Sequence, residues 1–355
     1  MKKKQLILGL VALVALVALV VWGRDKIHFD FAVFRSQLAL ANWGKIALGI
    51  GFIYLAYAFR SVRWALLLRH NKKVPLFSLL GTQVIGFTAV ALIGRIADPV
   101  RPYLVAKKTG LPLSNQFAVY IVERLFDAGA MALIFCAAIL LTPPGAMPHP
   151  ELVRKTAYWG LLLTVLGALF LVAVRMVGDW MATFLEDALG LLSKKLGTAV
   201  ANKIRAFRTG LDTMRSFSDF ASVISLSLGM WVLIALSYLE TCRAFVASPE
   251  LASMSPAKCV LLMVASGGAS IFQLPVLGWF TQIGLVTAAL SKFFGAAWEP
   301  ATACATMLLV VTFLCIIPTG LIWAQFEHVS LRKITEESEH ASEDLPAEES
   351  SEAAI

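Results

Sequence analysis

The sequence predicts an all-α polytopic membrane protein with about six full spans and two re-entrant helical hairpins in an inverted repeat. Of its 355 residues, 58% are hydrophobic and only 15% are charged, whereas an ordinary soluble domain has about a quarter charged residues. The apolar residues form runs long enough to cross the roughly 30 Å hydrocarbon core of a bilayer. The basic residues fall in short patches between these runs, so the composition excludes a soluble enzyme and argues against nucleic-acid binding.

The first apolar run, Leu6 to Trp22, follows three lysines and is either a signal peptide or an uncleaved span. No small-x-small cleavage pattern precedes Arg24, and 17 residues suffice to cross the bilayer. We therefore expect residues 1–43 to form an amino-terminal membrane anchor and an outer interfacial segment.

The further apolar segments are residues 44–68, 76–94, 115–141, 157–178, 220–245, 258–294 and 301–326. Loop lysines and arginines collect on the cytoplasmic side of a membrane protein. If residues 76–94 crossed completely, the strongly basic loop 179–219 would lie outside. If residues 76–110 instead enter and leave on the cytoplasmic side, that loop lies inside, and we therefore predict a re-entrant hairpin.

The length of residues 76–94 conflicts with a simple hairpin, because these residues are long enough to cross the bilayer alone. The segment must therefore tilt or break, and Gly81 and Gly86 are the candidate break points.

The same reasoning makes residues 258–294 a second hairpin, broken at Leu274-Pro275 and Gly278. The chain then contains two span–hairpin–span units of opposite orientation, residues 44–141 and 220–326. Inverted repeats with broken helices are typical of transporters, whose substrate site lies near the midplane where the breaks meet.

Residues 142–219 are expected to hold an outer loop, a span and a basic cytoplasmic amphipathic loop. Within it, residues 185–214 place apolar side chains at helical spacing opposite basic ones. This pattern fits a helix on the inner leaflet, and it also fits a loop helix packed on the bundle.

The carboxy-terminal segment 327–355 contains nine acidic and two basic residues and is expected to be a disordered acidic cytoplasmic tail. Before residue 327 lie 29 of the 31 basic and 14 of the 23 acidic residues. The membrane body therefore has a formal charge of +15, although the whole chain has only +8.

Residues 94–110 read GRIADPVRPYLVAKKTG between two apolar runs. Asp98 before Pro99 is typical of a helix start, and Gly110 of a helix end. A helix that begins inside the bilayer points unpaired N–H groups at the interior. With Arg95 and Arg101 beside that helix end, an anionic lipid phosphate would be well bound.

The next span carries Glu123, Arg124 and Asp127 in FAVYIVERLFDAGAM, and both carboxylates share a helical face with Tyr120. Each such charge costs at least ~2.5 kcal/mol at the bilayer centre. The carboxylates are therefore expected to meet the hairpin arginines, either as a structural ion-pair network or as a headgroup site. The candidate substrate-binding residues are Arg95, Asp98, Arg101, Glu123, Arg124 and Asp127.

Two other polar sets have structural and functional interpretations. Arg60 and Arg63, near the inner end of their span, are either snorkelling anchors or substrate contacts. The second hairpin is polar but almost uncharged, and its small residues either permit close packing or line a site. The candidate lining residues are Ser270, Gln273, Pro275, Gly278 and Gln282.

The cysteines and histidines have no metal-ligand spacing, so no metal and no cofactor are expected. The sequence also shows no arrangement of a nucleophile and a base that would indicate an enzyme.

The segments GRIADPVRPYLVAKKTG and VERLFD resemble the first signature of the lysylphosphatidylglycerol synthase transmembrane-region family, which is flippase-like. RSVRWALLL and LPVLGWFTQIGLVTAALSKFFGAAWEPATACATMLL also fit its pattern, and the resemblance covers about residues 6–326. One departure is that the PGGxGxxE element of the second hairpin has Thr281 or Gln282 in place of the acid. Only the acidic tail follows Phe326 where the synthases have a soluble transferase domain, so lysyl transfer is not expected.

The resemblance implies a multi-pass protein of the bacterial cytoplasmic (inner) membrane, and the charge distribution places both termini in the cytoplasm. It implies a lipid translocase that moves or presents an anionic phospholipid, an aminoacylated lipid or a polyprenyl-phosphate glycolipid. Its partners are then membrane lipids, not nucleic acid. The alternative is a non-transporting scaffold for a lipid-modifying enzyme or glycosyltransferase, which binds through the basic loop and the acidic tail.

Overall fold

In the computed structural model, all secondary-structure elements of the described residues are helices, as expected for an all-α protein. The described residues are 29–140, 142, 150–191, 193–211, 216–269, 277–327 and 329. The expected first span at residues 6–22 and the tail from residue 330 lie outside them.

Three helical stretches in this described part are long and apolar enough to cross a membrane. They are α3 (Trp43–Leu68), the stretch Ser218–Arg243 of α9 (Phe217–Arg243), and Trp298–Phe326. The last one joins α13 (Trp298–Leu309), the π-helix η4 (Val310–Leu314) and α14 (Ile316–Phe326). These stretches coincide with three of the predicted spans.

The first predicted hairpin consists of α4 (Leu80–Ile93), the short 3₁₀ helix η1 (Arg95–Ala97) and α5 (Val100–Thr109). The 14 residues of α4 rise only about 21 Å, less than a hydrocarbon core needs. The break lies at Gly94, whose φ of 93° glycine adopts readily. Gly81 and Gly86, the expected break points, lie inside α4 instead.

The ends of α5 differ slightly from the expected ones. Gly110 ends the helix in the left-handed conformation (φ 69°), and its N–H donates to the Ala106 carbonyl at 2.7 Å, as the sequence predicts. The first helical residue is Val100, with Pro99 at the N-cap position, so Asp98 is not the cap that the Asp-Pro pattern indicates.

The second predicted hairpin contains α11 (Pro256–Ala269) and α12 (Leu277–Phe294), which pack against each other. Its expected break at residues 274–275 lies outside the described residues, and Gly278, the other expected break point, lies inside α12.

The described helices group into two compact units. Unit 1 contains α2 (Phe31–Ala39), α3 up to Ile50, residues 92–95, α9 from Ser237, α10 (Pro249–Ala252), α11–α13 and η4. Unit 2 contains the rest of α3, α4, α5 and α9, together with α6 (Leu113–Leu140), α7 (Pro150–Gly190), α8 (Lys194–Leu211) and α14. The boundaries of the predicted repeats remain a prediction.

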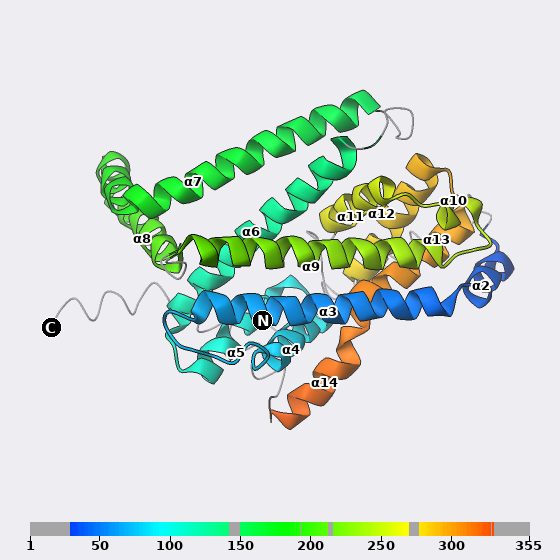
Figure 1. The fold of residues 1–355 in the computed structure, drawn as a ribbon, viewed down its shortest axis with the longest axis horizontal. Helices are drawn as coiled ribbons and strands as arrows, with labels where there is room; N and C mark the ends of the chain where they lie inside the picture. Colours follow the sequence, from blue (N-terminus) through cyan, green and yellow to red (C-terminus); the bar gives the residue numbers. More distant parts are fainter. Residues whose placement is uncertain are drawn as a thin grey trace. The chain divides into compact units, whose positions relative to one another are not determined.

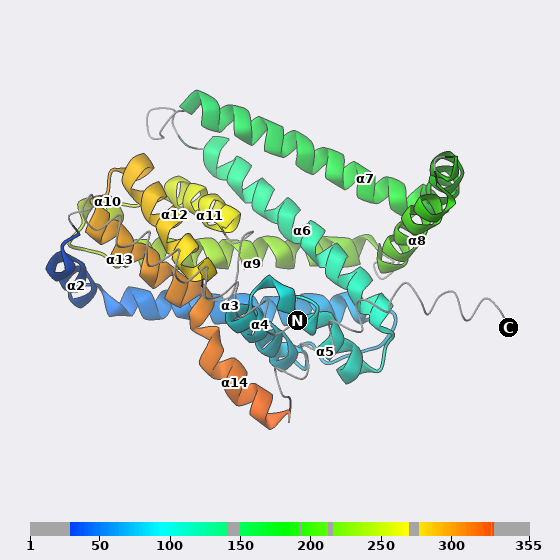
Figure 2. The ribbon, with the colours of Figure 1, turned by 180° about the vertical axis from the view of Figure 1, so that it is seen from behind.

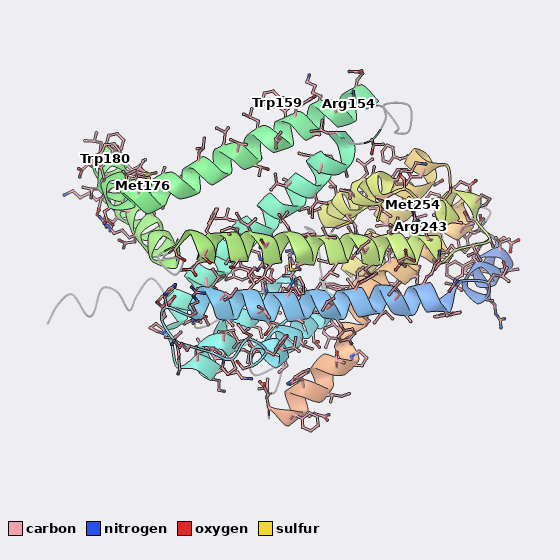
Figure 3. The ribbon with its side chains drawn as sticks, in the orientation of Figure 1. Arg154, Trp159, Met176, Trp180, Arg243 and Met254 are labelled. Atoms are coloured by element: carbon pink, nitrogen blue, oxygen red, sulfur yellow. The ribbon has the colours of Figure 1, made fainter. Side chains whose placement is uncertain are left out.

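Unit 1 is held together by backbone contacts and by a buried polar network. The Asn42 N–H donates to the Ala244 carbonyl at 2.8 Å, which joins the start of α3 to the end of α9. Arg243 Nε donates to the Met254 carbonyl at 3.0 Å and closes the turn before α11 (Figure 3).

The core of unit 2 takes one or more apolar residues from each of five helices. Figures 1 and 2 show α6 and α7 running in opposite directions, with α8 at the carboxy-terminal end of α7. The buried cluster includes Trp64 of α3, Val105 of α5, Val122 of α6, Val174 of α7 and Val223 of α9. Because these helices share one core, charged residues on α3, α5, α6 and α9 can meet inside it.

Helix α7 carries exposed aromatic residues toward both ends. Trp159 near its start and Trp180 near its end are labelled in Figure 3, and Trp180 stacks on Phe184 with ring centroids 5.5 Å apart. Val177, which lies between them, has non-helical backbone angles (φ −126°, ψ 21°), so α7 is kinked there. The two tryptophans therefore lie on different segments of α7.

The basic amphipathic segment forms a helix that packs on the bundle. Helix α8 begins at Lys194, so the expected continuous helix over residues 185–214 is interrupted after Gly190. A Cβ at Gly197 would lie 2.6 Å from the Glu186 carbonyl oxygen, which shows how closely α8 approaches α7. Arg205 also donates to Glu186 at 2.9 Å. These contacts favour the packed loop helix.

Candidate functional site

The candidate site of unit 2 is an ionic cluster built around one face of α6. Glu123 and Asp127, which are one turn apart on this helix, are 1% and 4% exposed. Four arginines lie within 4 Å of their carboxylate oxygens. We call these six residues the ionic cluster: Arg60, Arg63, Arg101, Glu123, Arg124 and Asp127.

Arg63 of α3 is the best-bonded cation of the ionic cluster. Its Nη1 lies 2.6 Å from Asp127 Oδ1 and its Nη2 lies 2.7 Å from Glu123 Oε1. Nη1 also donates to Ser227 Oγ of α9 at 2.7 Å, and the side chain is only 1% exposed. Arg63 therefore connects α3, α6 and α9.

Arg60 and Arg124 complete the coordination of the two carboxylates. Arg60 Nη1 lies 3.4 Å from Glu123 and 3.6 Å from Asp127. Arg124 Nη2 lies 2.9 Å from Glu123 Oε1 and 2.8 Å from Asp127 Oδ2, with a side chain 35% exposed at the edge of the cluster. Arg60 and Arg63 are thus buried counterions. Neither sequence interpretation of them, as anchors or as substrate contacts, anticipated this role.

Arg101 of α5 is the arginine of the cluster that lacks hydrogen bonds. It is fully buried, yet Nε, Nη1 and Nη2 have no hydrogen-bond acceptor in the described part of the chain. Its nearest charged partner is Glu123 Oε2, 3.6 Å from Nη1, and that oxygen also accepts no hydrogen bond there. Buried donors without acceptors are uncommon in folded proteins, so Arg101 is the candidate binding group of the cluster.

Aromatic rings surround the Arg101 guanidinium. Its carbon lies 4.4 Å from the ring centroid of Phe87, 5.0 Å from that of Tyr120 and 5.9 Å from that of Trp64. Cation–π contacts at these distances stabilise a desolvated charge without using its N–H groups. The rings therefore hold Arg101 in place and leave its donors available.

Gly86 of α4 makes room for the Arg101 side chain. A Cβ built on Gly86 would collide with Arg101 Cγ, and it would lie 3.3 Å from Cβ. This close approach packs α5 against α4 as a hairpin. It explains why the sequence has glycine in the middle of α4.

We expect Gly86→Ala to displace Arg101 and to lower the free energy of unfolding by about 1–3 kcal/mol, because the added methyl group overlaps the arginine stem. Gly129→Ala on α6 is the matched control, since a Cβ there meets nothing within 4 Å. The free energies of unfolding are compared by SDS titration of the purified proteins in mixed micelles. Equal values for the two variants would contradict the packing role of Gly86.

Two predicted residues are not members of the ionic cluster as defined above. Asp98 is partly buried in the turn before α5 and interacts electrostatically with Arg124 of the cluster. Arg95 is exposed on η1 and belongs to unit 1. The structure therefore brings together Arg101, Glu123, Arg124 and Asp127 of the predicted set, and a role of Arg95 in the site remains a prediction.

The described residues of the second predicted site belong to a bonded network in unit 1. Gln282, 7% exposed, donates from Nε2 to Ser266 Oγ at 3.1 Å, and the Tyr238 hydroxyl lies 2.9 Å from the same oxygen. Gly278 is buried nearby on α12. Ser270, Gln273 and Pro275 lie outside the described residues.

A surface hollow of about 510 Å³ lies apart from the ionic cluster, at the start of α7. It is lined by residues of that one helix, including Arg154 and Trp159, both labelled in Figure 3. No group of histidine, cysteine and acidic residues suited to a metal ion occurs in the described part of the chain.

The fold and the ionic cluster together define a helical integral membrane protein with ionised groups inside its bundle. The family model of the lysylphosphatidylglycerol synthase TM region matches residues 6–322. The chain belongs to this family, as the sequence resemblance predicted. No curated protein and no solved structure matches the chain.

Proposed function

We propose that this protein is a lipid translocase that binds the phosphate of an anionic lipid headgroup at Arg101. The observation that carries the proposal is the state of Arg101, which is fully buried and has three nitrogens without hydrogen-bond acceptors among the described residues. The two non-bridging oxygens of a phosphodiester match the paired donors of a guanidinium.

The charge of the ionic cluster supports an anionic ligand. Four guanidinium groups face two carboxylates, and Asp98 adds a third negative charge that acts on Arg124, so the positive charges exceed the negative ones by one. An unneutralised charge inside a protein is costly, and in a bilayer the surrounding lipid offers no water to reduce that cost. A bound phosphate would neutralise this excess.

The geometry suggests how the ligand is exchanged. In the structure, the free oxygen Glu123 Oε2 lies 3.6 Å from Arg101 Nη1, close enough to hold the arginine when no lipid is bound. Glu123 keeps its other oxygen on Arg63 and Arg124, so Arg101 can turn toward a phosphate without leaving the carboxylate unpaired. The acyl chains remain in the surrounding lipid.

Reconstitution of the purified chain in liposomes tests this function. Acyl-labelled phosphatidylglycerol in both leaflets is exposed to a membrane-impermeant reductant, which quenches only the outer leaflet. A translocase brings the inner-leaflet label outside, so the quenched fraction rises well above one half. A quenched fraction of one half, equal to that of protein-free liposomes, would reject translocation. It would leave the alternative of a scaffold for a lipid-modifying enzyme or glycosyltransferase.

A further inference from the structure

We infer that the acidic tail, residues 327–355, binds back onto a lysine patch on the surface of unit 2, so that the chain supplies the partner of its own basic surface. We call four residues the lysine patch: Lys72, Lys73, Lys107 and Lys108. The inference does not rest on the proposed function, because the patch lies outside the ionic cluster. It depends on the charge of the patch, on the place where the tail begins and on the composition of the tail.

Two segments of unit 2 bring the lysine patch together. Lys72 and Lys73 follow the end of α3, and Lys107 and Lys108 lie in the last turn of α5. Lys72 Nζ donates to the Thr109 carbonyl at 2.5 Å, which places the first pair of lysines beside the end of α5. All four lysines are exposed, so the patch is open to a ligand from outside the bundle.

The lysine patch has a surplus of positive charge. Among the described residues, its ion pair is that of Lys108 Nζ with Glu327 Oε1, at 2.7 Å. The carboxylate of Asp219, close to the patch, is bound by Arg69 and His70 and does not reduce the surplus. The carboxy-terminal end of α5 offsets only about half a charge through the helix dipole. The patch therefore calls for an anionic partner.

The acidic tail begins at the lysine patch. Glu327, its first acid, follows α14 directly and is the residue that pairs with Lys108. Val329 is held at the same place, since its N–H donates to the Ala324 carbonyl at 2.8 Å. The next acid, Glu336, is nine residues beyond Glu327, a reach of up to about 30 Å. The acids that follow can therefore meet the other lysines without any movement of the helices.

The composition of the tail complements the patch. Eight of the 17 residues from 336 to 352 are acidic, and none of them is lysine or arginine. Ion pairs on a surface are individually weak, but a tether turns each further pair into an intramolecular contact with an effective concentration in the millimolar range. Several weak pairs together can therefore hold the tail on the patch. Its attachment at Lys108 gives the tail an advantage over anionic lipid, the competing occupant.

Photo-cross-linking of the full-length chain tests this inference. A benzophenone amino acid replaces Leu345, which lies among the acids of the tail, and the adducts are located by mass spectrometry in purified protein in neutral detergent. We expect the adducts mainly on residues 69–77 and 103–110. Raising the salt from about 50 mM to about 500 mM should lower their yield at least about fivefold, because it shortens the screening length about threefold.

Variants of the patch show whether charge holds the tail. The combined variant keeps Lys108 and its ion pair and neutralises the other lysines: Lys72→Gln, Lys73→Gln and Lys107→Gln. It should lower the adduct yield about fivefold, because the lost surface pairs add up along one tether. Lys194→Gln is the matched control, since it removes an exposed lysine at the start of α8 in the same unit. It should leave the yield unchanged.

A variant of the tail reaches the same end without a change in the described helices. Four acids around the cross-linker are neutralised: Glu343→Gln, Asp344→Asn, Glu348→Gln and Glu349→Gln. The yield on residues 69–77 and 103–110 should again fall about fivefold. Because this variant leaves the bundle intact, its result does not depend on how well the lysine variant folds.

The outcomes separate the tail from other occupants of the patch. Adducts mainly on α8, adducts spread evenly over the surface, or a yield that neither salt nor the charge variants change would each overturn the inference. A second arm uses nanodiscs of phosphatidylcholine with and without phosphatidylglycerol. Equal yields in both support the inference. Loss of the adducts when phosphatidylglycerol is present would assign the patch to anionic lipid and overturn it.

Discussion

Replacing Arg63 with alanine is expected to lower the free energy of unfolding by about 3–5 kcal/mol, the cost of breaking a buried ion pair from one side. Arg63 makes the shortest contacts to both carboxylates, 2.6 Å to Asp127 and 2.7 Å to Glu123. Without it, Arg124 contacts the carboxylates from the exposed edge of the cluster, and Arg60 and Arg101 lie 3.4–3.6 Å from them. The loss is measured by SDS titration of the purified protein in mixed micelles.

Two further variants make the Arg63 prediction specific. Arg35→Ala removes an exposed arginine of α2 and should change the free energy of unfolding by no more than about 0.5 kcal/mol. Adding Asp127→Asn to Arg63→Ala should recover about 1–3 kcal/mol, because it removes one of the charges left unpaired. A loss below 1 kcal/mol for Arg63→Ala would show that the cluster does not stabilise the bundle.

Arg101→Ala is expected to reduce lipid translocation by at least about 100-fold. Two charge-assisted hydrogen bonds to a phosphate contribute about 3 kcal/mol together, which corresponds to that factor. Arg101 has no hydrogen bonds to lose among the described residues, but it is fully buried and contacts three aromatic rings. Its truncation should therefore also lower the free energy of unfolding, by about 2–3 kcal/mol, because it leaves a cavity in the core.

The liposome assay and the SDS titration check this pair of expectations on one protein sample. Arg101→Lys keeps the charge but not the paired donors and should retain about a tenth of the rate. Lys107→Ala on the same helix removes an exposed charge and should leave the rate unchanged. Normal translocation by Arg101→Ala would exclude the phosphate site at Arg101.

The first hairpin shows which features local sequence signals can predict and which they cannot. The charge distribution predicted a re-entrant segment at residues 76–110, and the short helices α4 and α5 on either side of Gly94 agree with it. The position of the break was predicted wrongly at Gly81 or Gly86. Both glycines serve helix packing, against Trp323 and Arg101, respectively. A glycine that makes room and a glycine that breaks a helix look alike in a sequence.

Two buried glutamines, Gln83 of α4 and Gln116 of α6, show what the sequence left unnoticed. Both lie in segments that are otherwise apolar, and an isolated amide carries no motif. Their burial and their hydrogen-bond partners are properties of the packed bundle: Gln116 accepts from the Trp64 indole, whereas the Gln83 amide has no partner among the described residues.

The sequence by itself determined the class of protein, the three long apolar helices, the family and most of the charged residues of the candidate site. Hydropathy and motif spacing are local properties, so they can be read along the chain without knowing the fold. Only the tertiary structure decided which charges pair. Arg63 reaches carboxylates 60 and 64 positions away, and such pairing depends on how α3, α5, α6 and α9 share one core. The same packing leaves Arg101 buried beside Glu123 with its donors free.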